Sequence, residues 1–225
     1  MQKIIFSALL VLASASAASA QNLIVNGGFE TGNFSGWSST GTNANAGGCD
    51  TQWTVVTNNT PCFSTGGPNS GSYQAGSSWD GDGPQHFFLS QIFANPNGVT
   101  SGTLSFWETY RMFYSGQQRT LTASIWNMGN TNLGNIFSQN VGPGTQLWTS
   151  FTADATAILA ANGGQNLQLV IDFYNPQFYT GPAAGAVDDI SLDVVVSSTP
   201  EPASLVLMVT GLVGVAGVAR RRKVA

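Results

Sequence analysis

Charged residues are scarce in this sequence, and the positive ones are nearly confined to its two ends. Charged side chains make up 8% of the 225 residues, with 7 Lys and Arg against 11 Asp and Glu. Between residues 21 and 199 the only cations are Arg111 and Arg119, against ten carboxylates, which gives this part a net charge of about −8. Nucleic-acid binding requires a cationic surface. The composition therefore excludes nucleic acid as a partner.

The usual catalytic signatures are also missing. The sequence has a single histidine, His86, and no Gly-x-Ser-x-Gly motif, so a Ser-His-Asp triad has little support. A glycosidase would need two carboxylates, and Glu108 with Asp172 is the obvious pair to consider. Alternation along their strands places these two on opposite faces. We expect no catalytic residue, and a secreted glycoside hydrolase stays as an alternative.

The N-terminus has the layout of a secretory signal peptide. Lys3 precedes the apolar stretch of residues 4–12, and small residues then lead to Ala18-Ser19-Ala20. We expect cleavage after Ala20, with residues 1–20 forming the signal peptide. Export of this kind takes the chain through the Sec translocon.

The C-terminal segment, residues 197–225, has three parts. Pro200-Glu201-Pro202 comes first, then the apolar run of residues 203–219, and last the basic cluster that begins Arg220-Arg221-Arg222. As a helix, the run would rise about 26 Å, which is just enough to cross a bilayer's hydrocarbon core. The positive charge after it should stay on the cytoplasmic side. The pattern predicts a transmembrane helix over residues 203–219.

This segment resembles the PEP-CTERM protein-sorting signal of Gram-negative bacteria, because the motif, the apolar run and the Arg-rich end occur in that order. The resemblance implies recognition by an exosortase, transient anchoring in the inner membrane, and a final place at the cell surface or in the extracellular matrix. It also implies an association with exopolysaccharide. A plain C-terminal anchor would meet the same physical constraints without needing the Pro-Glu-Pro.

The two cysteines, Cys49 and Cys62, lie in one Gly- and Asn-rich segment. In an exported protein the favoured interpretation is a disulfide, which for so short a loop contributes about 3 kcal/mol. A zinc site is disfavoured because His86 is not suitably spaced from them.

The region between the two end segments, residues 21–196, has the pattern of an antiparallel β-sandwich in one domain. Short alternating segments are separated by Gly, Asn and Pro, and only residues 154–161 suggest a short helix. The candidate strands are residues 53–57, 86–93, 103–110, 120–126, 147–152, 167–174 and 186–195.

Two segments carry a resemblance to galactose-binding-like jelly-roll domains, a group that includes many carbohydrate-binding modules. They are residues 23–30, Leu-Ile-Val-Asn-Gly-Gly-Phe-Glu, followed by Gly36-Trp37, and residues 186–192, Ala-Val-Asp-Asp-Ile-Ser-Leu. The resemblance implies an all-β fold of two antiparallel sheets.

Similar modules often hold a structural calcium near these two segments, which makes Glu30 and Asp188 the metal candidates. Strand alternation places Asp188 on the same face as Ile190, Leu192 and Val194. A carboxylate at the edge of an apolar face needs either a cation or hydrogen-bond donors. Both alternatives remain open for Asp188 from the sequence.

Alternation also predicts a ligand face. If the central strands are neighbours, five outward side chains would converge, and flat aromatic rings beside polar groups suit stacking on sugar rings. The alternative is that these aromatic residues only pack against the rest of the protein. We expect a noncatalytic, carbohydrate-associated surface protein, or a purely structural one without a discrete ligand. The five candidates are Trp107, Arg111, Trp126, Asp172 and Tyr174.

Overall fold

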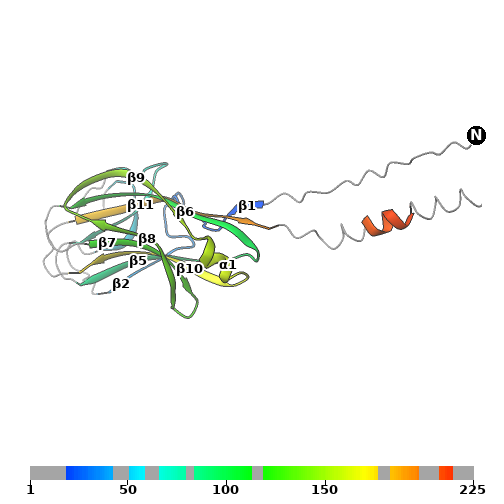
Figure 1. The fold of residues 1–225 in the computed structure, drawn as a ribbon. Coiled ribbons are helices and arrows are strands. Elements are labelled where there is room, and N and C mark those ends of the chain that lie inside the picture. The colour runs from blue at the N-terminus through cyan, green and yellow to red at the C-terminus, as the bar shows by residue number, and fades with distance from the viewer. Residues whose placement is uncertain are drawn as a thin grey trace, which may run out of the picture. The chain divides into compact units, whose positions relative to one another are not determined.

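The computed structural model describes residues 19–42, 51–58, 66–79, 84–112, 119–176, 183–197 and 208–214. Ala20–Val196 form one compact unit, and the two ends of the chain belong to a second unit. The compact unit consists of two stacked sheets, which confirms the expected antiparallel jelly-roll β-sandwich (Figure 1).

The strands follow one another in a different order in space than in the chain. Sheet A has the order β3-β4-β11-β6-β9, with β1 beside β11, and sheet B has the order β2-β5-β10-β7-β8. The neighbours along both five-strand paths are antiparallel. In sheet A the bounds are β1 Ser19–Asn22, β3 Thr51–Val56, β4 Gln74–Trp79, β6 Val99–Met112, β9 Gly144–Asp154 and β11 Ala183–Val196. In sheet B they are β2 Ser38–Thr42, β5 Gln85–Ala94, β7 Arg119–Asn127, β8 Asn132–Val141 and β10 Asn166–Asn175, and the helix α1 is Thr156–Ala161.

Each strand predicted from alternation is present, as is the short helix, but four strands were missed. The missed strands are β1, β2, β4 and β8. β4 is buried along its whole length, so its sequence does not alternate. β2 is polar throughout, and β8 has two register irregularities against β7 that interrupt the period of two.

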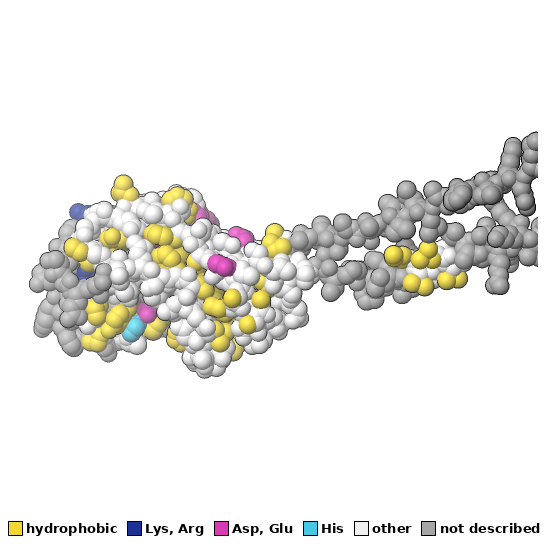
Figure 2. Space-filling model, viewed as in Figure 1, with side chains coloured by type: hydrophobic (Ala, Val, Ile, Leu, Met, Phe, Trp, Pro, Cys, Tyr) yellow, Lys and Arg dark blue, Asp and Glu magenta, His cyan; other side chains and the backbone are white. Residues whose placement is uncertain are grey.

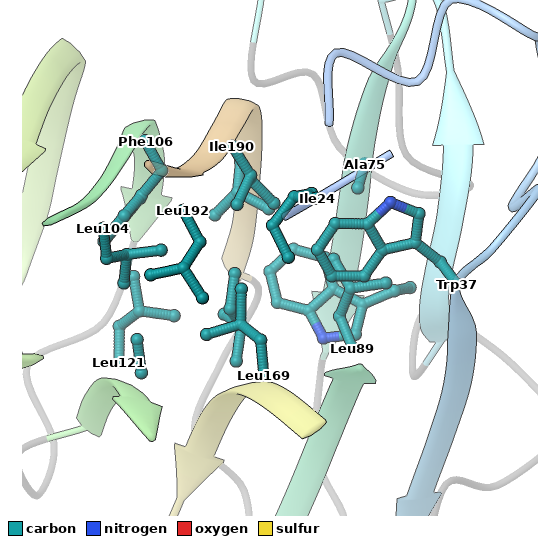
Figure 3. Close-up of a cluster of buried hydrophobic side chains, with 14 of the residues drawn as sticks. Ile24, Trp37, Ala75, Leu89, Leu104, Phe106, Leu121, Leu169, Ile190 and Leu192 are labelled. Carbon is teal, nitrogen blue, oxygen red and sulfur yellow. The ribbon is translucent and has the colours of Figure 1, made fainter. Parts of the chain in front are cut away.

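The hydrophobic core lies between the two sheets. Leu104, on β6, and Leu192, on β11, are directly opposite each other in sheet A, and Leu169, on β10, faces them from sheet B (Figure 3). All three side chains are fully buried. Each such burial contributes about 1.5–3 kcal/mol relative to exposure. The inner faces of the sheets are thereby held together.

A bulge in β11 corrects the expected orientation of Asp188. The register against β6 shifts between Asp188 and Ser191, and Asp189 has a φ of 50°. Asp188 pairs with Trp107, so both point to the outer side of sheet A, whereas Leu192 beyond the bulge points inward. The uninterrupted alternation assumed from the sequence therefore assigned Asp188 to the wrong face.

The same bulge receives the N-terminal segment of the domain. The Ile190 N–H donates a hydrogen bond to the Gly27 carbonyl oxygen at 3.0 Å. A Cβ at Gly27 would lie 1.9 Å from the Ile190 carbonyl oxygen, so no larger residue fits without moving the backbone. Glycine is required here by close approach of two backbones.

We predict that Gly27→Ala lowers the free energy of unfolding by about 3 kcal/mol, because the added methyl group overlaps the bulge. Urea denaturation of the purified protein measures this change. Gly67→Ala is the matched control, since a Cβ there has no atom within 4 Å. It should change stability by less than about 0.5 kcal/mol. Equal effects of the two substitutions would contradict this packing.

In the C-terminal segment, residues 208–214 are helical. Among the described residues, no helix is sufficiently long and apolar to span a membrane. Residues 203–207 and 215–219 lie outside the described part, as do residues 1–18 of the expected signal peptide. Both segments stay predictions.

Candidate functional site

The outer side of sheet B, which we call the B face, combines aromatic and polar side chains. On β10, the residues between Gln168 and Tyr174 that point outward alternate with Leu169 and Ile171, which are fully buried in the core. Directly paired residues of neighbouring strands point to the same side. The three central strands therefore contribute His86, Phe88, Ser90 and Ile92 from β5, Gln168, Val170, Asp172 and Tyr174 from β10, and Thr120, Thr122, Ser124 and Trp126 from β7.

A hollow of about 170 Å³ lies at one end of the B face. Val170 and Ser90 are paired across β10 and β5 and are nearly buried, so they form its base. Phe88 and Trp126 line it from different strands. The hollow is smaller than the 300–1,000 Å³ typical of sites for drug-sized ligands, and is of a size for a single ring. Its complete lining is Thr40, Phe88, Ser90, Trp126, Asn130, Gln168 and Val170.

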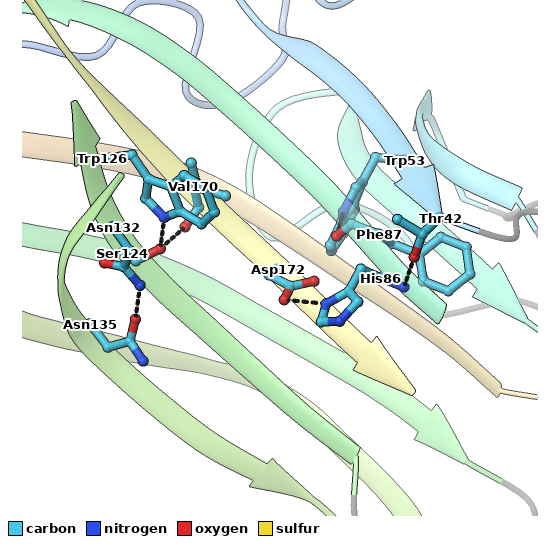
Figure 4. Close-up of polar contacts among 10 residues, drawn as sticks. All are labelled: Thr42, Trp53, His86, Phe87, Ser124, Trp126, Asn132, Asn135, Val170 and Asp172. Carbon is cyan, nitrogen blue, oxygen red and sulfur yellow. Dashed lines mark hydrogen bonds and ion pairs between the residues drawn. The ribbon is translucent and has the colours of Figure 1, made fainter. Parts of the chain in front are cut away.

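The Trp126 ring is held in place by the sheet beneath it. Its Nε1–H donates to the Ser124 hydroxyl at 2.7 Å, and that hydroxyl donates to the Val170 carbonyl oxygen at 3.4 Å (Figure 4). The indole N–H is thus satisfied within the protein. What Trp126 offers to a ligand is its apolar ring surface.

The other end of the B face is built around His86. Its ring stacks on Phe88, with ring centroids 5.3 Å apart, and on Tyr174, with centroids 4.3 Å apart. His86 Nδ1 lies 2.7 Å from Asp172 Oδ2 (Figure 4). Burial raises the pKa of the Asp172 carboxyl, and the hydrogen bond and charge of His86 oppose that rise. The pair is partly accessible, with 39% of the His86 side chain and 15% of the Asp172 side chain exposed.

The structure does not bring the five predicted ligand residues together. Trp126, Asp172 and Tyr174 lie on the B face, whereas Trp107 and Arg111 are on β6 in sheet A. The expected convergence assumed that β6 and β7 were neighbours in one sheet. Instead β6 belongs to sheet A and β7 to sheet B, so the two groups lie on different sheets.

Sequence reasoning had found part of the B face and missed the rest. Phe88 and Gln168 are not among the residues predicted from the sequence, and His86 enters there only through a catalytic triad and a zinc site, both of which the sequence disfavours. Because Leu89 on β5 points into the core, alternation along β5 predicts that Phe88 points outward. That β5 pairs with β10 cannot be predicted from the sequence of either strand alone.

Glu108 and Asp172 cannot act together as glycosidase carboxylates in this geometry. Glu108 is 1% exposed and belongs to sheet A, whereas Asp172 is on the B face. One Glu108 carboxylate oxygen accepts a hydrogen bond from Gln146 Nε2 at 3.3 Å, and the other has no partner among the described residues. Burial raises the pKa of Glu108 to about 7, and the Gln146 hydrogen bond opposes this rise.

We predict that Glu108 makes stability depend on pH. Because the folded protein holds this proton more tightly than the unfolded chain does, the free energy of unfolding falls as pH rises from 4.5 to about 7. The loss attributable to Glu108 is roughly 3 kcal/mol. Urea denaturation at several pH values measures it, and Glu108→Gln should remove this share of the decline. Part of the decline in stability with pH should remain in this variant, because the pKa of Asp188 is also raised. An unchanged decline in Glu108→Gln would contradict the assignment.

The two metal candidates, Glu30 and Asp188, hold one loop through its backbone. Glu30 accepts hydrogen bonds from the N–H groups of Ser72 and Tyr73 at 3.0–3.1 Å. Asp188 accepts from the N–H groups of Asn69 at 2.9 Å and Ser70 at 3.2 Å. Burial raises the pKa of Asp188 to about 7, and the Ser70 N–H is the largest opposing influence.

These contacts do not fit a calcium shell. Convergent N–H donors repel a cation, whereas calcium is bound by oxygen ligands. In the part of the chain that the structure describes, no group of three or more His, Cys, Asp or Glu side chains could hold a metal ion. The contacts favour the hydrogen-bonding alternative that the sequence left open for Asp188. Asp189 supports it, since its side chain binds Asn69 and Ser70 side chains at 2.8 and 2.7 Å.

Cys49 and Cys62 lie outside the described residues. Their cross-link therefore stays a prediction.

The end of the chain matches a known sorting signal. Residues 198–223 match the family model of the PEP-CTERM protein-sorting motif. Pro200, Glu201, Pro202 and the three arginines Arg220–Arg222 all fall within this match, which confirms the resemblance. The motif implies exosortase processing, export and transient membrane anchoring before a surface or extracellular location. No curated protein matches the sequence.

Solved structures that are similar to this chain include an adhesin domain, an arabinofuranosidase and a protein in complex with a galactotriose. The K3 cleaved adhesin domain of Lys-gingipain from Porphyromonas gingivalis W83 is 16% identical, with a TM-score of 0.51 and coverage of 78% of this chain and 98% of that one. Arabinose-bound MgGH51 α-L-arabinofuranosidase is 15% identical, with a TM-score of 0.52 over 77% of this chain and 26% of that one. TmCBM61 in complex with β-1,4-galactotriose is 20% identical, with a TM-score of 0.49 over 76% and 97%. At these identities the two likenesses with a TM-score above 0.5 concern the fold alone.

Proposed function

We propose that this protein is an exported, noncatalytic carbohydrate-binding protein whose B face binds a polysaccharide of the cell surface or extracellular matrix. The single observation that carries the proposal is the hollow between Phe88 and Trp126, where two aromatic side chains line a ring-sized space. Sugar rings present apolar C–H surfaces that stack on aromatic faces, and hydroxyl groups that need hydrogen-bond partners at the rim.

The lining provides both kinds of contact. Gln168 and Asn130 carry amide groups that donate and accept hydrogen bonds, and Thr40 adds a hydroxyl. The Trp126 N–H is already bonded to Ser124, which leaves the indole surface for stacking. Thr40, Gln168 and Trp126 are on strands of sheet B, which holds their backbones in place and limits the conformational entropy lost when a ligand binds.

The sorting motif supports the location. We infer that the chain leaves the cytoplasm of a Gram-negative bacterium through the Sec translocon, is held briefly in the inner membrane and is released by an exosortase. Exopolysaccharide is the glycan class that we infer for its final location at the cell surface or in the matrix.

The Trp126→Ala variant tests the proposal. Affinity gel electrophoresis of the full-length protein in gels containing galactan, arabinan, xylan or β-glucan would measure retention by each neutral glycan. We expect wild type to be retained by at least one, and Trp126→Ala to bind that glycan at least about tenfold more weakly because it lacks the stacking surface.

Trp107→Ala is the matched control, because Trp107 is also a half-buried tryptophan but lies on sheet A. It should keep wild-type retention. Loss of binding in Trp107→Ala but not in Trp126→Ala would move the site to sheet A. No retention of wild type by any glycan would contradict carbohydrate binding and favour a structural role without a ligand.

A further inference from the structure

The B face has an unusual charge distribution. Its described residues include one carboxylate, Asp172, and one histidine, His86, and Asp172 Oδ2 lies 2.7 Å from His86 Nδ1. The strands at its edges add only hydroxyl and amide side chains, from Thr40 and Thr42 on β2 to Asn132 and Asn140 on β8. In Figure 2 the cyan histidine, the only one in the chain, lies beside an acidic side chain and among hydrophobic ones.

Neither arginine of the domain contributes a guanidinium group to the surface of the B face. Arg119 is fully buried, and Arg111 is on β6 of sheet A. Proteins that bind carboxylate groups usually do so with arginine, whose guanidinium group donates two parallel hydrogen bonds. The described part of the B face has no such group to offer a uronic acid.

We propose that the B face selects neutral polysaccharides and rejects those that carry uronic acids, with Asp172 as the residue that determines this selectivity. The inference rests on the proposed function. His86 holds Asp172 in position through Nδ1 and is itself fixed by stacking on Phe88 and Tyr174. The carboxylate therefore stays at a fixed place on β10, the central strand of sheet B, which also carries Gln168 and Val170 of the hollow.

The physical reason is repulsion between like charges near a low-dielectric surface. A glycan that lies across the hollow and continues along β10 passes Asp172, which is four residues, or about 13 Å, from Gln168. A uronate carboxylate in that path would be brought near the Asp172 carboxylate, and at partly buried sites such repulsion is only weakly screened. We expect it to weaken binding by about tenfold.

The test compares one glycan in two charge states. The neutral hexose polysaccharide that wild type binds best is oxidised at part of its C6 primary alcohols, which converts them to carboxylates and leaves the backbone unchanged. Affinity of the full-length protein for both forms is measured in mildly alkaline buffer of low salt. We expect wild type to bind the oxidised form about tenfold more weakly, and added salt to reduce this difference.

Asp172→Asn should remove most of the difference in affinity between the oxidised and the neutral form, so the readout is the ratio of the two affinities within each variant. Asparagine retains an oxygen acceptor for His86 Nδ1. Asp193→Asn is the matched control, because it removes the same charge from an exposed position on sheet A. It should leave the discrimination unchanged.

Two results would overturn the inference while the proposed function stands. One is equal affinity of wild type for both forms, and the other is a reduction of this difference in Asp193→Asn as large as in Asp172→Asn, which would assign the effect to net charge. Failure of wild type to bind any neutral glycan would instead remove the proposed function and this inference with it.

Discussion

Burial of the inner faces of sheets A and B against each other fixes which side chains of every central strand point outward. A strand has two sides, so once Leu169 and Ile171 are committed to the core, Gln168, Val170 and Asp172 must form the opposite surface. A slip of one residue would expose the core set and bury the polar set. The cost of that exchange is what keeps the B face in register.

Carboxylates within this fold accept several hydrogen bonds, carry a desolvation cost that raises their pKa, or do both. Asp188 and Glu30 use backbone N–H groups to hold the loop around Asn69–Tyr73 against the bulge of β11. Glu108 is buried and accepts only one hydrogen bond among the described residues, from the Gln146 side chain. Burial with so little compensation raises its pKa. The hollow on the B face differs from both, because the polar side chains of Thr40, Asn130 and Gln168 that line it are at least partly exposed to solvent.

The sequence predicted the fold class and the central strands because period-two alternation is strong where one side of a strand is buried. It did not predict β4, which is buried on both sides, or the bulge that turns Asp188 to the outer side of sheet A. For the candidate site, alternation correctly turned Trp126, Asp172 and Tyr174 outward. It could not tell that Trp107 and Arg111 belong to another sheet, because strand order depends on long-range pairing that no local pattern encodes.

The central claim is that the B face is the glycan-binding surface, and an NMR titration tests it most directly. Backbone and indole N–H resonances of isotope-labelled protein would be followed while an oligosaccharide of the glycan that the protein binds is added. The account predicts that the shifts concentrate on β5, β10 and β7, with the largest around Trp126 and Gln168. Shifts confined to β6 and β9 of sheet A, or no saturable shifts with any glycan, would contradict it.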